Sequence, residues 1–135
     1  MILFIDDEKR EMESFVIELK LSGFDVNFIK NVDDAWNYLT SNPEEVKLMI
    51  LDIMMPAGNK FKDDDIHNGL RTGVRFFDEM RVQFPNLPII IFTNVSDPNV
   101  VKKFEHENMC RYFSKPNLLP DQLVDEIKSF LGKQS

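Results

Sequence analysis

Short apolar runs and amphipathic stretches alternate along the whole length of the chain. Continuous apolar runs at 2–5, 47–53 and 87–93 are typical of strands that are buried on both faces. Segment 24–29 alternates apolar and polar residues, which also indicates a strand, and 110–114 is a further candidate. The pattern therefore predicts five strands.

Between these runs, apolar residues recur at helical spacing and predict five helices. Gly23 supplies a stop for the first of them. Asp97 and Pro98 start the fourth, because aspartate is a favoured N-cap residue and proline fits the first turn. The predicted helices cover 11–23, 32–41, 73–84, about 98–107 and 120–131.

Each predicted strand is followed by a helix, and such alternation implies a parallel sheet with helices on both faces. We expect an α/β fold of the flavodoxin-like (βα)5 type, with a doubly wound five-stranded sheet in the order 2-1-3-4-5. Residues 1–135 are expected to form one domain. The polar segment 57–68 is the one irregular stretch, between the third strand and the third helix.

Composition narrows the classes of partner. The formal net charge is -7, from 16 basic and 23 acidic residues, which argues against direct nucleic-acid binding and against an anionic membrane surface. Cys110 is the one cysteine, so no internal disulfide is expected and a reducing, cytoplasmic location is predicted. No segment approaches the length of a membrane span, and Asp6 interrupts the short apolar N-terminus.

Acidic residues directly follow two of the predicted strands. Asp6 and Asp7 come after the first strand, and Asp52 follows the apolar part of the third. In an open parallel sheet, ligands bind beyond the carboxyl ends of the strands. With the order 2-1-3-4-5, these three carboxylates converge on one pocket, and Thr93 and Lys115 lie on its other rim.

Three carboxylates in one pocket repel each other, and a hard divalent cation such as Mg²⁺ removes that penalty because it prefers oxygen ligands. A lysine opposite them balances the remaining charge. A carboxylate nucleophile, a metal, an ammonium and a hydroxyl are the parts needed for phosphoryl transfer to an aspartate.

These residues resemble a known family. The Asp6-Asp7 pair, Asp52 within LDIMMP, Thr93 and the Ser-Lys-Pro at 114–116 look like the receiver domain of bacterial two-component response regulators, the CheY-like proteins. The resemblance spans essentially the whole chain. It implies a stand-alone response regulator in which Asp52 accepts a phosphoryl group from a histidine kinase or a phosphotransfer protein.

The resemblance also implies roles for the other residues. Mg²⁺ would be bound by Asp7 directly, by Asp6 mainly through water, by Asp52, and by the backbone carbonyl of Met54. The chain would catalyse only its own phosphorylation and dephosphorylation, and it would not be an enzyme acting on other substrates.

The remaining family positions belong to the switch, the residues that would respond to phosphorylation of Asp52. Lys115 would pair with a phosphoryl oxygen, and the bond from Lys115 to Pro116 would be cis. Thr93 would move towards the phosphoryl group, and the ring of Tyr112 would turn inward with it. The switched surface would bind a downstream protein target, and dimerisation of the phosphorylated form stays open.

The sequence departs from the family at two places near Asp52. The glycine that usually follows the third-strand loop is best matched by Gly73, 17 positions after Pro56, so the 57–68 loop is enlarged by about a dozen residues. Asn94 is larger than the residue usually found after the switch threonine, and it could narrow access to the site.

Other interpretations remain open. Asp6 and Asp7 could simply cap the first helix, and Tyr112 could be a packed aromatic residue. The chain could be a phosphorylation-independent protein-interaction module of the same fold. A haloacid dehalogenase-type phosphatase fits less well, because it would need an acid at the position of Met54. A flavodoxin-like electron carrier would need a phosphate-binding loop after the first strand.

Overall fold

The computed structural model describes residues 1–56 and 70–132. The expected loop insertion at 57–68 lies outside these residues. No helix within the described part of the chain combines the length and the apolar character that crossing a membrane requires.

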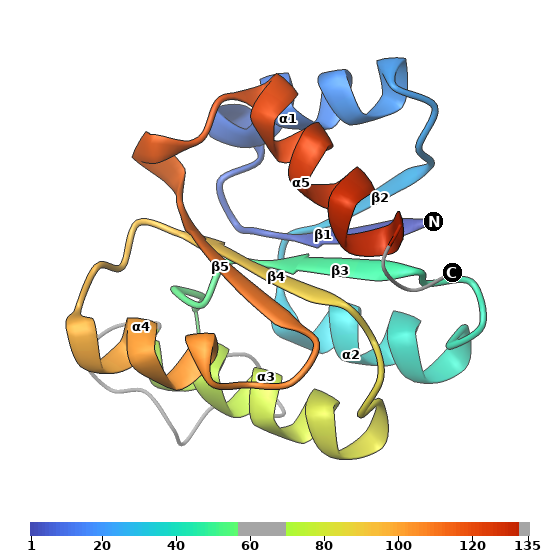
Figure 1. The fold of residues 1–135 in the computed structure, drawn as a ribbon. Helices are drawn as coiled ribbons and strands as arrows, with labels where there is room; N and C mark the ends of the chain where they lie inside the picture. The colour runs from blue at the N-terminus through green and yellow to red at the C-terminus, as the bar shows by residue number, and fades with distance from the viewer. Residues whose placement is uncertain (57–69, 133–135) are drawn as a thin grey trace.

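Five parallel strands form one sheet in the order β2-β1-β3-β4-β5, which confirms the predicted fold class and strand order (Figure 1). The described strands are β1 (Ile2–Ile5), β2 (Val26–Ile29), β3 (Leu48–Leu51), β4 (Ile89–Thr93) and β5 (Cys110–Ser114).

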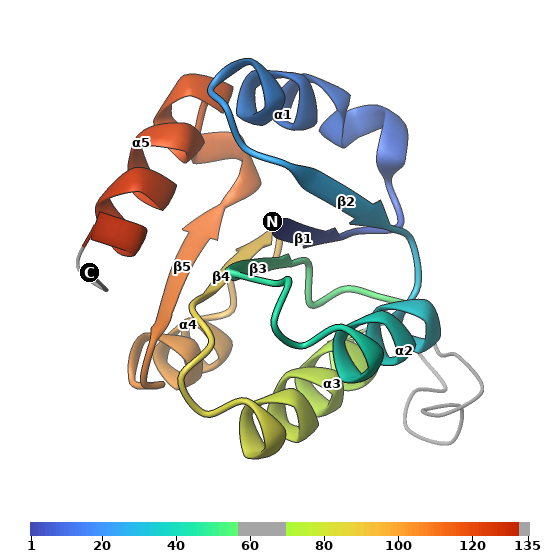
Figure 2. The same cartoon turned by 90° about the vertical axis from the view of Figure 1, so that its right-hand side faces the viewer.

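Helices cover both faces of the sheet. In Figure 2, α1 and α5 lie on one face, and α2, α3 and α4 lie on the other. The bounds are α1 (Lys9–Leu21), α2 (Val32–Ser41), α3 (Leu70–Gln83), α4 (Pro98–Glu105), the short 3₁₀ helix η1 (Lys115–Asn117) and α5 (Pro120–Gly132).

Alternate residues of the central strands serve two separate cores. Leu3 and Leu51 point into the core under α2, α3 and α4, whereas Phe4 and Ile50 point into the core under α1 and α5. Because β1, β3 and β4 are buried on both faces, they read as continuous apolar runs. β2 lies at the sheet edge and is only half-buried, which explains its mixed sequence.

Helix ends follow the expected local chemistry. Gly23, with φ +96°, ends α1, and its N–H donates to the Lys20 carbonyl at 3.1 Å. Asp97 is the N-cap of α4 and accepts a hydrogen bond from the Asn99 N–H at 2.8 Å. The predicted end of α4 near residue 107 was two residues too late.

Gly73 lies inside α3 and not at its start. An added Cβ would lie 1.9 Å from the carbonyl oxygen of Ile53, in the loop after β3. Glycine is therefore required because the helix passes directly over that backbone. The predicted start at residue 73 was wrong: α3 begins at Leu70.

At the opposite end of the sheet from the carboxyl ends of the strands, Arg81 joins three segments. Its guanidinium donates hydrogen bonds to the carbonyls of Phe84, Pro85 and Leu87 after α3, and to the carbonyl of Met109 before β5. The four donor–acceptor distances lie between 2.7 and 3.2 Å. This one side chain holds the α3–β4 connection against the start of β5.

Candidate functional site

The sheet places Asp6 and Asp52 side by side. β1 and β3 pair in parallel with Ile5 opposite Leu51, so the residues that follow them also lie opposite one another. The Asp52 N–H donates to the Ile5 carbonyl at 3.0 Å, which continues the pairing by one residue. Both aspartates are buried, at 0% and 3% exposure. Their convergence follows from strand register.

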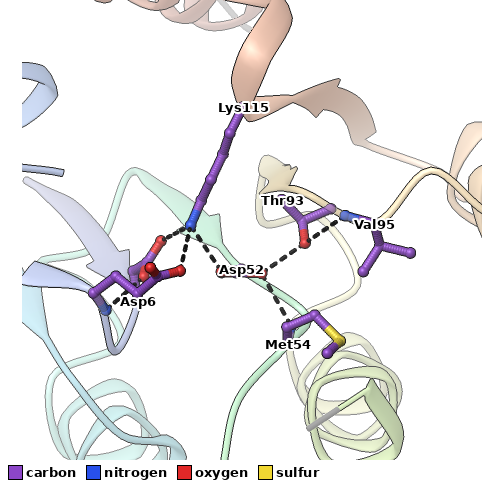
Figure 3. Close-up of polar contacts among 7 residues, drawn as sticks. Asp6, Asp52, Met54, Thr93, Val95 and Lys115 are labelled. Atoms are coloured by element: carbon purple, nitrogen blue, oxygen red, sulfur yellow. Dashed lines mark hydrogen bonds and ion pairs between the residues drawn. The ribbon is translucent and has the colours of Figure 1, made fainter. Parts of the chain in front are cut away.

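Lys115 reaches these carboxylates from the end of β5 (Figure 3). Its Nζ lies 2.8 Å from Asp6 Oδ2 and 2.9 Å from Asp52 Oδ2, with Glu8 Oε1 at 3.6 Å. The lysine side chain is only 7% exposed. It is therefore a buried counter-ion for the acids at the neighbouring strand ends.

The second oxygen of Asp52 accepts two hydrogen bonds. Thr93 Oγ1 donates to Asp52 Oδ1 at 2.7 Å, and the Met54 N–H donates to the same oxygen at 3.0 Å. Thr93 is fully buried at the end of β4. The structure thus brings Asp52, Thr93 and Lys115 into direct contact, as the sequence predicts.

Burial is the largest influence on the ionisation of Asp6, and it raises the pKa of this carboxyl from 3.8 to about 6. The Lys115 ammonium and the Glu8 N–H lower it, and the charge of Asp52 raises it further. Burial would lower the pKa of Lys115, but the carboxylates of Asp6 and Asp52 outweigh it, so that pKa is raised. The lysine therefore stays charged.

The donor set fits a hard divalent cation. One carboxylate oxygen from each of Asp6, Asp7, Glu8 and Asp52 lies within 4.8 Å of the others. Asp6 Oδ2 is buried and contacts Lys115, but it accepts no well-oriented hydrogen bond from the described residues. A cation with oxygen ligands would satisfy that atom, and Mg²⁺ meets this requirement. The carbonyl of Met54 as a further ligand stays a prediction.

Glu8 is the residue of this site that the sequence analysis missed. It directly follows the Asp6-Asp7 pair, and that position was the signal available. Glu8 is also the N-cap of α1, so the interpretation of Asp6 or Asp7 as the cap is wrong. Instead, Asp6 Oδ1 accepts a hydrogen bond from the Glu8 N–H at 2.8 Å, just before the helix.

Tyr112 connects the site to the α4–β5 face. Its hydroxyl donates a hydrogen bond to the Val95 carbonyl, and its ring stacks on Phe104 of α4 with centroids 6.4 Å apart. The Val95 N–H in turn donates to Thr93 Oγ1 at 3.4 Å. Burial and the charge of Asp52 raise the pKa of Tyr112, so the hydroxyl keeps its proton.

One expectation about a residue next to the site is wrong, and another is not tested by the structure. The Lys115–Pro116 bond is trans, since the described residues contain no cis peptide bond, and the predicted cis isomer is wrong. The trans form is the lower-energy isomer before proline, and here it leads into η1. Asn94 is exposed, and its effect on access to the site stays a prediction.

Comparison with known proteins gives a consistent result. Residues 2–128 match the family model described as "Response regulator receiver domain". A curated relative, the hydrogenase transcriptional regulatory protein HoxA of Cupriavidus necator, is 26% identical over 134 residues. That alignment covers 98% of this chain and 24% of the relative, so the chain spans about a quarter of its length.

Solved structures share the fold. The receiver domain of Francisella response regulator 1452 superposes with a TM-score of 0.77 at 18% identity, covering 99% of this chain and 98% of that one. A CheY-like response regulator receiver domain protein from Methanospirillum hungatei gives a TM-score of 0.75 at 22% identity, covering 98% and 94%. At these identities the likeness establishes the fold alone.

Proposed function

This chain belongs to the response regulator receiver domain family, and from that premise we propose that it accepts a phosphoryl group on Asp52 in a Mg²⁺-dependent reaction. One observation carries the proposal. The buried Asp52 carboxylate lies 2.9 Å from the Lys115 ammonium and 2.7 Å from the Thr93 hydroxyl at the carboxyl end of the sheet. The same two groups would contact a phosphoryl group attached to this carboxylate.

The reaction would form an acyl phosphate. A carboxylate oxygen of Asp52 attacks the phosphorus of a phosphohistidine and the P–N bond breaks. The leaving nitrogen keeps the electron pair, and the ring departs as neutral imidazole because its other nitrogen already carries a proton. The Lys115 ammonium, 2.9 Å from Asp52 Oδ2, would pair with a phosphoryl oxygen. Mg²⁺ held by Asp6, Asp7 and Asp52 would supply the charge neutralisation that such transfers require.

Phosphorylation would switch a protein-binding surface. In the unphosphorylated chain Thr93 donates to Asp52, and the next contacts run through Val95 to Tyr112 and the α4–β5 face. A phosphoryl group offers new acceptor oxygens to the same hydroxyl and therefore changes this chain of contacts. We propose that a downstream protein binds the changed face.

The partners follow from the chemistry. The phosphodonor would be a histidine kinase or a phosphotransfer protein, and the net charge of -7 argues against nucleic acid as a direct ligand. We further propose that the protein is cytoplasmic and that the only chemistry of this domain is on itself. The alternative is an interaction module of the same fold that works without phosphorylation.

Intact-mass measurement after incubation with acetyl phosphate and Mg²⁺ tests the proposal. The native protein should gain one phosphoryl group, and Asp52→Ala should gain none. Asp125→Ala, which removes an exposed acid from α5, is the matched control and should behave like the native protein. No gain on the native protein, with Mg²⁺ shown to bind, would favour the phosphorylation-independent module.

A further inference from the structure

Glu8 is a fourth carboxylate at the site, and the phosphoryl-transfer proposal does not use it. Although Glu8 is the N-cap of α1, its side chain makes no capping hydrogen bond. Its Oε1 lies instead 3.6 Å from Lys115 Nζ, among the acids at the strand ends. The carboxylate is therefore directed to the charged centre and not to the helix end.

The backbone fixes where this side chain starts. The Glu8 N–H donates to Asp6 Oδ1 at 2.8 Å, and the Asp6 N–H donates to the Ile29 carbonyl of β2 at 3.1 Å. The Glu8 side chain itself is 46% exposed. Because the backbone of Glu8 is fixed and its carboxylate reaches solvent, the side chain can rotate towards or away from a bound ion without moving the backbone.

A second observation points to a cation at this place. Asp6 is fully buried, and among the described residues its Oδ2 has the Lys115 ammonium at 2.8 Å but no well-oriented hydrogen bond. Oxygens of all four acids lie within 4.8 Å of one another. Ligands on opposite sides of Mg²⁺ are about 4.2 Å apart, and those across Ca²⁺ are about 5 Å apart. Separations of up to 4.8 Å are compatible with either ion, but four carboxylates exceed the one or two that Mg²⁺ usually takes.

We propose that Glu8 determines which divalent cation the site prefers. It would be a direct ligand to Ca²⁺, whereas it would act on Mg²⁺ only by long-range electrostatic attraction. The inference rests on the proposed cation site. Mg²⁺ keeps several waters and is usually bound by one or two carboxylates, so it has little need of a fourth. Ca²⁺ takes six to eight oxygens in flexible geometry and would recruit Glu8.

The contact with Lys115 does not oppose this role. At 3.6 Å it is the longest of the three lysine–carboxylate distances, and Asp6 and Asp52 hold the ammonium at 2.8 and 2.9 Å. A pair with a half-exposed partner contributes little. Glu8 can therefore turn from the lysine to a cation without leaving the ammonium unpaired.

Isothermal titration calorimetry with Mg²⁺ and with Ca²⁺ on the native protein, Glu8→Gln and Glu11→Gln tests the inference. Glu11, in the first turn of α1, is exposed and carries the same charge, so it controls for general electrostatics. Glu8→Gln should lose about tenfold or more in Ca²⁺ affinity and only about threefold for Mg²⁺. Glu11→Gln should change either affinity by less than about twofold.

The outcomes separate the two proposals. An equal loss for both ions in Glu8→Gln, or no loss for either, would overturn the role of Glu8 and leave the cation site intact. A native protein that binds neither ion would overturn the cation site itself, and the inference with it. Thermal unfolding in EDTA should be the same for the two glutamine variants, which checks that folding is unaffected.

Discussion

Thr93 Oγ1 donates a hydrogen bond to Asp52 Oδ1 at 2.7 Å, so the hydroxyl that is proposed to respond to phosphorylation already contacts the acceptor carboxylate. The Val95 N–H lies 3.4 Å from the same hydroxyl oxygen. A change in the charge of Asp52 would therefore reach the β4–α4 loop through the Thr93 side chain.

Thr93→Val keeps the shape of this side chain and removes the donor. Among the described donors, the buried Asp52 Oδ1 then retains the Met54 N–H, and we expect a loss of about 1–2 kcal/mol in the free energy of unfolding. Urea denaturation measures this as a lower midpoint at unchanged slope. Thr40→Val removes an exposed hydrogen bond on α2 and should cost less than about 0.5 kcal/mol. Equal stability of both variants would contradict the importance of the Thr93 contact.

The raised pKa of Asp6 predicts a pH-dependent stability of the metal-free protein. Between about pH 4 and pH 6 the folded state binds more protons at this carboxyl than the unfolded state, so stability should fall as the pH rises through this window. Asp6→Asn should then raise the free energy of unfolding by about 1–3 kcal/mol at pH 7.5 in EDTA, and by much less at pH 4.5. Urea titrations at the two pH values measure the difference.

Asp125→Asn is the control for that experiment, because Asp125 is exposed on α5. Its effect on the free energy of unfolding should be small and the same at both pH values. The stabilising effect of added Mg²⁺ should be weaker in Asp6→Asn than in the native protein, because a ligand charge is lost. If Asp6→Asn is less stable than the native protein at pH 7.5, ionisation of Asp6 does not destabilise the folded state.

Tyr112→Phe separates phosphorylation from its consequences. Within the part of the chain that the structure describes, the hydroxyl donates to the Val95 carbonyl and to no carboxylate, so the mass gain with acetyl phosphate should match that of the native protein. The amide chemical-shift changes of α4 on phosphorylation should be reduced by half or more in ¹H–¹⁵N spectra. Tyr38→Phe removes a hydroxyl bound to Glu45, far along the chain from the switch, and should leave these changes intact.

Gly73→Ala should be strongly destabilising. Its Cβ would lie 1.9 Å from the Ile53 carbonyl, so α3 or the loop after Asp52 must shift, at a cost of about 2–4 kcal/mol. Gly132→Ala is the matched control, because nothing lies within 4 Å of its added Cβ at the end of α5. Thermal unfolding should show a lower Tm for the first variant and an unchanged or higher Tm for the second. The opposite ranking would contradict the close approach of α3 to Ile53.

The fold and the centre of the site were predictable because both depend on strand order. Once β1 and β3 are neighbours in register, Asp6 and Asp52 must lie together, and Lys115 at the end of β5 faces them. Periodicity and residue type carry that information. The glycine in α3 was misjudged because a local pattern cannot reveal that a helix passes over the Ile53 backbone.

The parts that sequence reasoning missed depend on individual side-chain directions. Whether Glu8 turns to its helix end or to Lys115 is decided by a few rotations about single bonds. The hydrogen bond from Tyr112 to the Val95 carbonyl depends on the path of a loop. The isomer of the Lys115–Pro116 bond was carried over from the family, and no local pattern in this chain specifies it.

The Arg81 contacts and the proposed phosphorylation site lie at opposite ends of the sheet. At the amino ends of the strands, one guanidinium fastens the α3–β4 connection and the start of β5 through four carbonyls. At the carboxyl ends, the Met54 and Val95 N–H groups donate to Asp52 and Thr93, the residues proposed to respond to phosphorylation. We therefore expect rearrangements on phosphorylation to begin at that end of the sheet and to leave the Arg81 contacts in place.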